Sequence, residues 1–474
     1  MITNGMQRLI AFAALAGLVL AACGGGSGTN IAGIDRTGTP AIAAYGTISA
    51  FGSVVVNGVH YDTSGATITI NGDPGTQADL AIGDVVLVKG TLDSGGAKGV
   101  AASVSFDPNV EGPITSIDLT ANTLVALGQL VRVSADTSFD SSIQPPALSS
   151  LALGDVIEVS GLVQADGSIS ATRIEHRPVG GPYEVLGVVS GHQPAQHTFL
   201  IGIQVVNYQS AVVSGVPNGV IANGQRLQVK GSLVNGVLVA TRVEYEGNTL
   251  GGVSGERREV EGAITRFASA TDFDVSGLPV TTNAQTQFED GTAADLAPNV
   301  KVEISGSLNG AGVLVASKVE VRRSAPLRIV APVDSVDAGG GSLVVLGVTV
   351  RIDALTRLED QSSQEVRPFS LANLAVGDYV EVRGNESPTG SGRVLATLVQ
   401  RNDPQQSAQV QGFVQSVSPP QNFVVFGVQI STNGSTQFDG VSGVGMLRVG
   451  DLVKVSGTKV GDRGIAAREV ERED

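Results

Sequence analysis

Apolar and polar positions alternate through most of this 474-residue sequence. The clearest instance is a nine-residue motif in which a Gly-Asp turn precedes two apolar residues that flank one other residue, usually polar. The motif occurs six times, as IGDVVLVKG at 82, LGDVIEVSG at 153, NGQRLQVKG at 223, PNVKVEISG at 298, VGDYVEVRG at 376 and VGDLVKVSG at 449. An apolar face with a period of two predicts a half-buried β-strand, and the Gly-Asp pair predicts the turn before it.

Successive copies of the motif lie 70 to 78 residues apart, which indicates one folded unit repeated in tandem. Each unit opens with a run that carries a central Gly or Ala, such as VEGPITSI at 110–117. Two alternating runs hinged at a Gly follow, then a polar connector, the motif strand, and a last run such as VLVATRVEY at 237–245. Five strands in so short a unit should curl into a closed barrel, since closure removes the exposed sheet edges.

The order of these runs, with a connector between the third and fourth strands, resembles the OB-fold. A small sandwich or an SH3-like barrel is the alternative. The predicted fold class is therefore all-β, a tandem array of six small five-stranded OB-like β-barrels after a signal peptide and flexible linker. The expected segments are a signal peptide at 1–22, a linker at 23–44, and units at 45–107, 108–178, 179–247, 257–323, 326–402 and 408–474. Short connectors predict that the barrels extend outward as a string.

The N-terminus predicts export. Arg8 precedes an apolar run, LIAFAALAGLVLAA, which is shorter than the ~20 residues that a membrane-spanning helix needs and ends in small residues. The sequence LAAC that ends at Cys23, the only cysteine, resembles the lipobox of bacterial lipoproteins, in which the cysteine becomes the lipidated first residue. This resemblance makes Cys23 the membrane anchor. Gly24, rather than Asp, after the cysteine favours the outer membrane, with the leaflet left open.

The repeat itself also resembles a known family. The recurring pattern VxGxI, FxVxG, TxF, GDxVxVxG and AxxVE is similar to the repeated module of bacterial lipoproteins called domain of unknown function 5666. The resemblance extends from Tyr45 to Glu473, although Gln225 and Val300 replace the expected Asp in the third and fourth units. The family implies a fold and no activity.

Composition argues against nucleic acid as a partner. The formal charge is −15, no basic stripe is present, and the chain has no Trp. OB-like proteins that bind single strands stack bases on aromatic residues in a basic groove. Phe139, Phe288 and Phe438 recur at one place, where we expect them to close the third strand as core residues.

Candidate chemistry is sparse. His60, His176, His192 and His197 are scattered over three units without the spacing of zinc enzymes, so we expect surface histidines. The repeated Asp84, Asp155, Asp378 and Asp451 suit turn residues, because two units replace them and keep the strand. We therefore predict no catalytic, cofactor or metal site, and no cofactor.

Two functions fit these observations. The first is a lipid-anchored cell-envelope protein that serves as a non-catalytic multi-barrel scaffold or binding array for protein or glycan partners. The alternative is an envelope enzyme, or an accessory to one, that acts on cell-wall or surface glycans. A cleft that gathers Asp, Glu, His or Ser side chains in one unit would favour the enzyme.

Overall fold

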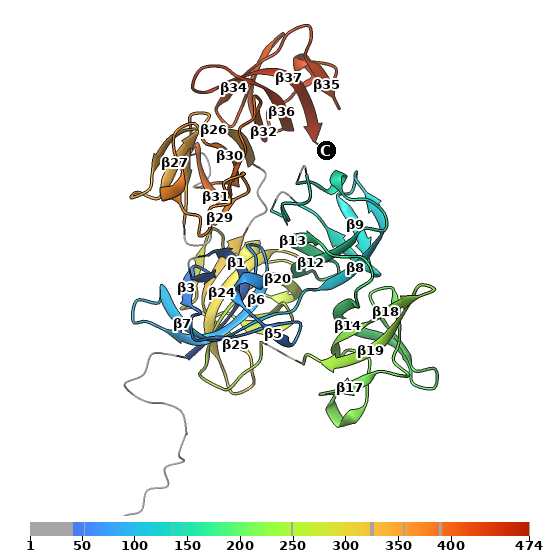
Figure 1. The fold of residues 1–474 in the computed structure, drawn as a ribbon. Coiled ribbons are helices and arrows are strands. Elements are labelled where there is room, and N and C mark those ends of the chain that lie inside the picture. The colour runs from blue at the N-terminus through green and yellow to red at the C-terminus, as the bar shows by residue number, and fades with distance from the viewer. Residues whose placement is uncertain are drawn as a thin grey trace, which may run out of the picture. The chain divides into compact units, whose positions relative to one another are not determined.

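The computed structural model describes residues 41–473 except 52, 135, 145, 248–249, 323–326, 354–355 and 388–390. Cys23 and the predicted signal peptide lie outside the described residues. Within that part of the chain, no helix is both long and apolar enough to cross a membrane. The described residues form strands, loops and short 3₁₀ turns (Figure 1).

The first three repeats, called units 1 to 3, contain strands β1 to β19. Unit 1 has β1 (Ala41–Ala50), β2 (Val54–Val56), β3 (Val59–Asp62), β4 (Thr67–Ile70), β5 (Asp73–Gly75), β6 (Val85–Leu92) and β7 (Lys98–Phe106). Unit 2 has β8 (Val110–Asp118), β9 (Thr123–Ala126), β10 (Gln129–Arg132), β11 (Ser138–Phe139), β12 (Val156–Val163) and β13 (Ile169–His176). Unit 3 has β14 (Tyr183–Gln193), β15 (Thr198–Ile201), β16 (Gln204–Asn207), β17 (Val212–Ser214), β18 (Arg226–Val234) and β19 (Val237–Tyr245).

Units 4 to 6 repeat the same order. Unit 4 has β20 (Arg257–Ser269), β21 (Asp272–Val275), β22 (Leu278–Thr281), β23 (Gln287–Glu289), β24 (Lys301–Leu308) and β25 (Leu314–Arg322). Unit 5 has β26 (Leu327–Asp337), β27 (Ser342–Val345), β28 (Val348–Arg351), β29 (Arg357–Asp360), β30 (Tyr379–Glu386) and β31 (Arg393–Asn402). Unit 6 has β32 (Ala408–Ser418), β33 (Asn422–Val425), β34 (Val428–Ser431), β35 (Gln437–Asp439), β36 (Leu452–Lys459) and β37 (Gly464–Glu473).

Strand pairing within each unit gives the predicted OB-like barrel. In unit 2, β8 pairs with β9 and β12, and β9 pairs with β10, all antiparallel. β10 then pairs in parallel with β13, which closes against β12. The five main strands therefore follow the order 1-2-3-5-4-1, with the third and fifth strands parallel, as in an OB-fold. The all-β prediction and the OB-like topology are confirmed.

Each connector between the third and fourth strands contains more structure than expected. It holds one three-residue 3₁₀ turn, namely η1 (Gln77–Asp79), η2 (Leu148–Ser150), η3 (Pro217–Gly219), η4 (Ala293–Asp295), η5 (Leu371–Asn373) or η6 (Val444–Met446). It also holds a short strand that pairs in parallel with the fifth main strand. Phe139, Phe288 and Phe438 lie in these short strands and pack on the cores, so their assignment to the third strand is wrong.

The last glycine of the repeated motif has a packing role in all six units. At this residue the fourth strand passes a bulge in its pairing with the fifth strand. A Cβ atom placed on Gly306 or Gly384 would lie 2.2 or 2.3 Å from a carbonyl oxygen of the fifth strand. Only glycine permits this close approach, so much of the motif is fixed by the barrel itself.

The six units do not form a string of barrels joined only by connectors, which corrects that prediction. β1 pairs in parallel with β20, whereas β8 pairs with β14 and β26 with β32 antiparallel. The described strands consequently make three sheets, one each for units 1 and 4, units 2 and 3, and units 5 and 6. β1 also starts at Ala41 instead of residue 45, because its first residues pair with β6 and β20.

Candidate functional site: a polar cavity between units

Each barrel carries a row of three outward-facing residues that we call the outer row. It consists of the central residue of the motif and its cross-strand neighbours on the first and fifth strands. In unit 4 the outer row is Glu261, Glu303 and Glu320. The rows of the other units are Tyr45, Leu87 and Ser105; Glu111, Glu158 and Glu175; Leu186, Gln228 and Glu244; Val330, Glu381 and Gln400; and Gln411, Lys454 and Glu471.

In the outer row of unit 4, Glu303 and Glu320 are buried and Glu261 is partly buried. Nearby cations neutralise the three carboxyl groups to different degrees. Glu261 forms an ion pair with Lys301 at 2.5 Å and accepts a hydrogen bond from the Thr47 backbone N–H at 2.7 Å. Burial by itself would raise the pKa of Glu261, but Lys301 and Thr47 lower it to about 2. Glu303 lies 3.5 Å from Arg322, and its burial raises its pKa to about 8 despite that cation. Two adjacent carboxyl groups therefore hold opposite protonation states near neutral pH.

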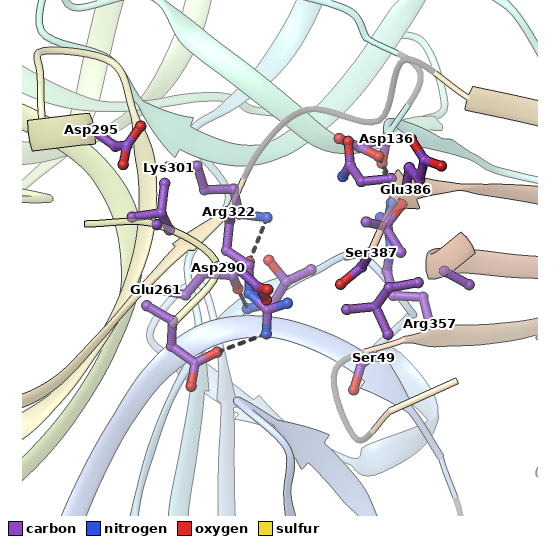
Figure 2. Close-up of a pocket in the computed structure, with 18 of the residues that line it drawn as sticks. Ser49, Asp136, Glu261, Asp290, Asp295, Lys301, Arg322, Arg357, Glu386 and Ser387 are labelled. Atoms are coloured by element: carbon purple, nitrogen blue, oxygen red, sulfur yellow. Dashed lines mark hydrogen bonds and ion pairs between the residues drawn. The ribbon is translucent and has the colours of Figure 1, made fainter. Parts of the chain in front are cut away.

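Beside this row lies a cavity of about 480 Å³, a size typical of small-molecule sites. Its walls come from units 1, 2, 4 and 5, including Ser49, Asp136, Asp290 and Glu386. Figure 2 shows Asp290, Lys301 and Arg322 of unit 4 across from Glu386, Ser387 and Arg357 of unit 5. No aromatic side chain is among the lining residues of the described chain.

Arg357 fixes the wall between units 2 and 5. This side chain is buried, and its guanidinium donates to Ser138 Oγ and to the Thr172 carbonyl, each at 3.2 Å, and to the Asp136 carbonyl. Thr397 Oγ1 donates to Asp136 Oδ1 at 3.0 Å across the same boundary. Burial lowers the pKa of Arg357. These contacts position Asp136 at the cavity, and they leave fewer Arg357 N–H groups to bind a ligand.

The repeated aspartates act as turn residues. Asp155, Asp378 and Asp451 each accept a hydrogen bond from the backbone N–H three residues earlier, at 2.8 to 3.0 Å. Asp84 does the same for Ala81, and in unit 3 the Gln225 side chain accepts the equivalent bond. Their predicted role in the turn is confirmed. Each turn also places its Gly, or Asn299 in unit 4, at a positive φ.

The histidines lie apart from the cavity. His192 Nε2 lies 2.8 Å from the Tyr208 hydroxyl, and the ring of His197 packs on the same tyrosine. His60 contacts Ser53, and His176 lies 3.6 Å from Asp155. Among the described residues, no group of three or more His, Cys, Asp and Glu side chains could hold a metal ion.

Sequence reasoning missed the cavity residues. It noted the residue at the centre of the motif but not its neighbours, because the outer row depends on which strands pair. An available signal was the recurrence of Glu in the first strand at 111 and 261 and in the last strand at 175, 244 and 320. The carboxylates also gather in a cavity between units, whereas the cleft considered from the sequence lies within one unit.

Comparison with known protein families identifies the repeat. Residues 45–105, 111–175, 187–244, 261–320, 330–400 and 411–471 match the family described as domain of unknown function 5666. The chain belongs to this family. The six matched segments coincide with the six barrels, and each begins within its first main strand. A comparison with curated proteins finds no similar sequence.

Proposed function

We propose that this protein is a lipid-anchored cell-envelope binding protein that holds a polar ligand without chemically changing it. Cys23 is the anchor, and the six domains of unknown function 5666 form the scaffold. The partner is a glycan or a protein of the envelope. The outer membrane is the favoured location, since Gly24 follows the anchor cysteine.

The cavity is the observation that carries this proposal. Its walls combine hydroxyl groups with charged groups, and the charged groups are already held by neighbouring strands, as Glu261 is by Lys301 and Thr47. Polar groups fixed before a ligand arrives lose little conformational entropy on binding. The walls come from four units, which gives the repetition of the barrel a purpose in binding.

The binding proposal is tested by blocking the cavity. Ser387 lies at its wall and is only partly exposed, so Ser387→Trp should fill part of the space. Ser418→Trp, on an exposed strand end of unit 6, is the matched control. We expect thermal-shift screening against envelope glycans and proteins to find a ligand that Ser387→Trp loses and Ser418→Trp keeps. Equal binding by both variants would contradict the cavity as the site.

The anchor is tested separately. Each buried methylene of an acyl chain contributes ~0.8 kcal/mol, so several chains hold a protein almost irreversibly. We expect Cys23→Ser to move the protein from the membrane fraction to the soluble fraction of the envelope. Retention of Cys23→Ser in the membrane as tightly as the parent would show that the anchor lies elsewhere.

A second function is favoured by the pair Glu261 and Glu303. Enzymes that cleave glycosidic bonds use two carboxyl groups of which one is protonated and the other ionised. The pKa values of about 2 and about 8 on directly opposed residues have this character. The alternative is thus an envelope enzyme on glycans, and turnover of a cell-wall or surface glycan that Glu303→Gln abolishes would establish it in place of passive binding.

A further inference from the structure

The cationic side chains of the cavity are occupied by protein acceptors. Lys301 is paired with Glu261 at 2.5 Å. Arg322 Nη2 lies 2.9 Å from Glu320 and 3.5 Å from Glu303, so it is held by ion pairs, although it makes no hydrogen bond of good geometry among the described residues. Arg357 donates to Ser138, Thr172 and Asp136. An anionic ligand would therefore have to displace existing contacts, so the cavity is poorly suited to phosphate or carboxylate groups.

Carboxylates at the cavity remain available. The ion pairs found among the described residues include none with Asp136, Asp290 or Glu386. Glu386 accepts one hydrogen bond, from the Gly392 N–H at 2.7 Å, and Asp136 accepts one from Thr397. Asp290 and Glu386 lie on opposite walls in Figure 2. Together these groups favour a ligand with positive charge.

Hydroxyl groups supply the rest of the lining. Ser49, Thr47 and Ser387 all contribute to the wall. Thr47 is only 8% exposed, and its hydroxyl oxygen lies near the Glu261 carboxylate without forming a hydrogen bond of good geometry among the described residues. A buried polar atom without a partner costs free energy unless a ligand or water satisfies it. The absence of aromatic residues in this lining disfavours ligands that bind by ring stacking.

We propose that the cavity binds an oligosaccharide that carries free amino groups. Its ammonium groups would pair with Asp290, Glu386 and Asp136, and its hydroxyl groups would meet Ser49, Thr47 and Ser387. The volume of about 480 Å³ accommodates only a few sugar rings, so a short segment of a longer chain is recognised. This inference rests on the proposed binding function and specifies its ligand class.

The test compares two oligosaccharides that differ only in the amino groups. Isothermal titration calorimetry of the full-length protein in detergent would use glucosamine tetramer and N-acetylglucosamine tetramer at pH 6. We expect the amino form to bind at least tenfold more tightly, with affinity falling as salt screens the ion pairs. Equal or tighter binding of the acetylated form would overturn the ligand class and leave the glycan-binding function intact.

Matched variants locate the binding. The double variant Asp290→Asn with Glu386→Gln removes two charges and should weaken binding of the glucosamine tetramer at least tenfold. Both changes suit the fold, because Asn tolerates the positive φ of residue 290 and Gln keeps the acceptor for Gly392. Asp462→Asn, on an exposed loop of unit 6, is the control and should bind as the parent does. An unchanged affinity in the double variant would overturn the site.

Two further outcomes separate the inference from the proposed function. Spermidine that binds as tightly as the tetramer would show that ammonium groups suffice, which overturns the sugar as ligand. Failure of both tetramers and spermidine to bind would also overturn the inference. The proposed binding function would then be decided by the screen described above, in which Ser387→Trp should lose a ligand that Ser418→Trp keeps.

Discussion

Glu303 of unit 4 and Glu381 of unit 5 occupy the same place in the repeat and are equally buried, at 5% and 2% exposed. Their surroundings nevertheless give them opposite chemistry. The Arg328 guanidinium donates two hydrogen bonds to the Glu381 carboxylate, at 2.9 and 2.7 Å, and Arg383 donates a third. Although burial alone would raise it, these cations lower the pKa of Glu381 to about 2. Among the described residues, Glu303 forms an ion pair with Arg322 alone, at 3.5 Å, and its burial raises its pKa to about 8.

The difference shows how one scaffold acquires different surfaces. The inward-facing residues fill the barrel core and the motif glycines permit the close approach of the strands, and both sets are alike in the two units. The outer-row residues do not pack in the core and can therefore differ between units. In unit 5 the Glu381 carboxylate of β30 binds Arg328 of β26 and so links these two strands. Unit 4 leaves its carboxyl groups beside a cavity. Binding therefore resides in outward residues that meet between repeats.

The largest loss of stability should come from Glu381→Leu, and Glu303→Leu at the equivalent position is the comparison. Breaking a buried, fully paired ion network costs about 3 kcal/mol or more, because the remaining charges stay buried. We expect Glu381→Leu to lower the opening free energy of β30 by about 3 kcal/mol in hydrogen-exchange experiments on the full-length protein. Glu303→Leu should cost at most about 1 kcal/mol in β24 at pH 6, since a protonated carboxyl group is lost. Similar costs in both units would refute the contrast.

Substitution of the motif glycine should affect units 4 and 5 equally, unlike substitution of the outer-row glutamates. Gly306 and Gly384 both approach a carbonyl oxygen so closely that a Cβ atom needs backbone movement. We expect Gly306→Ala and Gly384→Ala each to destabilise its own unit by about 2 kcal/mol. The two effects should be equal, because the scaffold is shared. Exposed Gly434→Ala, which meets open space, is the control and should be nearly neutral.

A rise from pH 5 to pH 8 should destabilise unit 4 and leave unit 5 unchanged. The folded pKa of Glu303, about 8, exceeds the ordinary value of 4.5, so its stabilising effect is full below pH 4.5 and lost as pH rises through 8. Glu261, Glu320, Arg322 and Lys318 face Glu303 and tune this window. We expect the opening free energy of β24 to fall by about 2 kcal/mol from pH 5 to pH 8, and Glu303→Gln to abolish that fall.

Unit 5 is the reference for this pH experiment. The folded pKa of Glu381 is about 2, below the ordinary 4.5, so its contribution is full above pH 4.5 and is lost only as pH falls through 2. Between pH 5 and 8 this carboxylate should leave β30 unchanged. A parallel fall in β24 and β30 would mean that a global effect, rather than Glu303, sets the pH dependence.

The smallest effect concerns the turn before the motif strand. Asp378→Ala removes the acceptor for the Ala375 N–H, 3.0 Å away, and should cost unit 5 about 1 kcal/mol. Unit 4 has Val300 at this position, where it packs against the barrel core, so Val300→Asp should gain an acceptor for the Ala297 N–H but lose this apolar contact and be nearly neutral. Thermal melts with hydrogen exchange resolve both changes. A variant that keeps its stability but loses a ligand would make the aspartate functional.

The sequence predicted the barrel well because its rules are local. Two apolar residues around one outward residue, a turn with positive φ and a repeated glycine all lie within nine residues. Even the exception agrees, since Asn299 adopts the positive φ that glycine takes elsewhere. The six units and their OB-like strand order were predictable for this reason.

The cavity was not predictable, because it depends on contacts between residues far apart in the chain. Thr47 meets Glu261 only because β1 pairs with β20, and Asp136 meets Thr397 only because units 2 and 5 are in contact. No local pattern encodes these pairings. The short strands of the connectors were missed because residues such as Gln287–Glu289 are too few to show a period.

The most direct measurement is hydrogen exchange of the full-length protein with and without saturating glucosamine tetramer. We expect protection to concentrate in β20, β24 and residues 395–397, which border the cavity, and to leave β36 of unit 6 unchanged. Protection spread evenly over the six units would mean that each barrel binds alone, and protection confined to unit 6 would place the site elsewhere. Either result would contradict a binding site built between repeats.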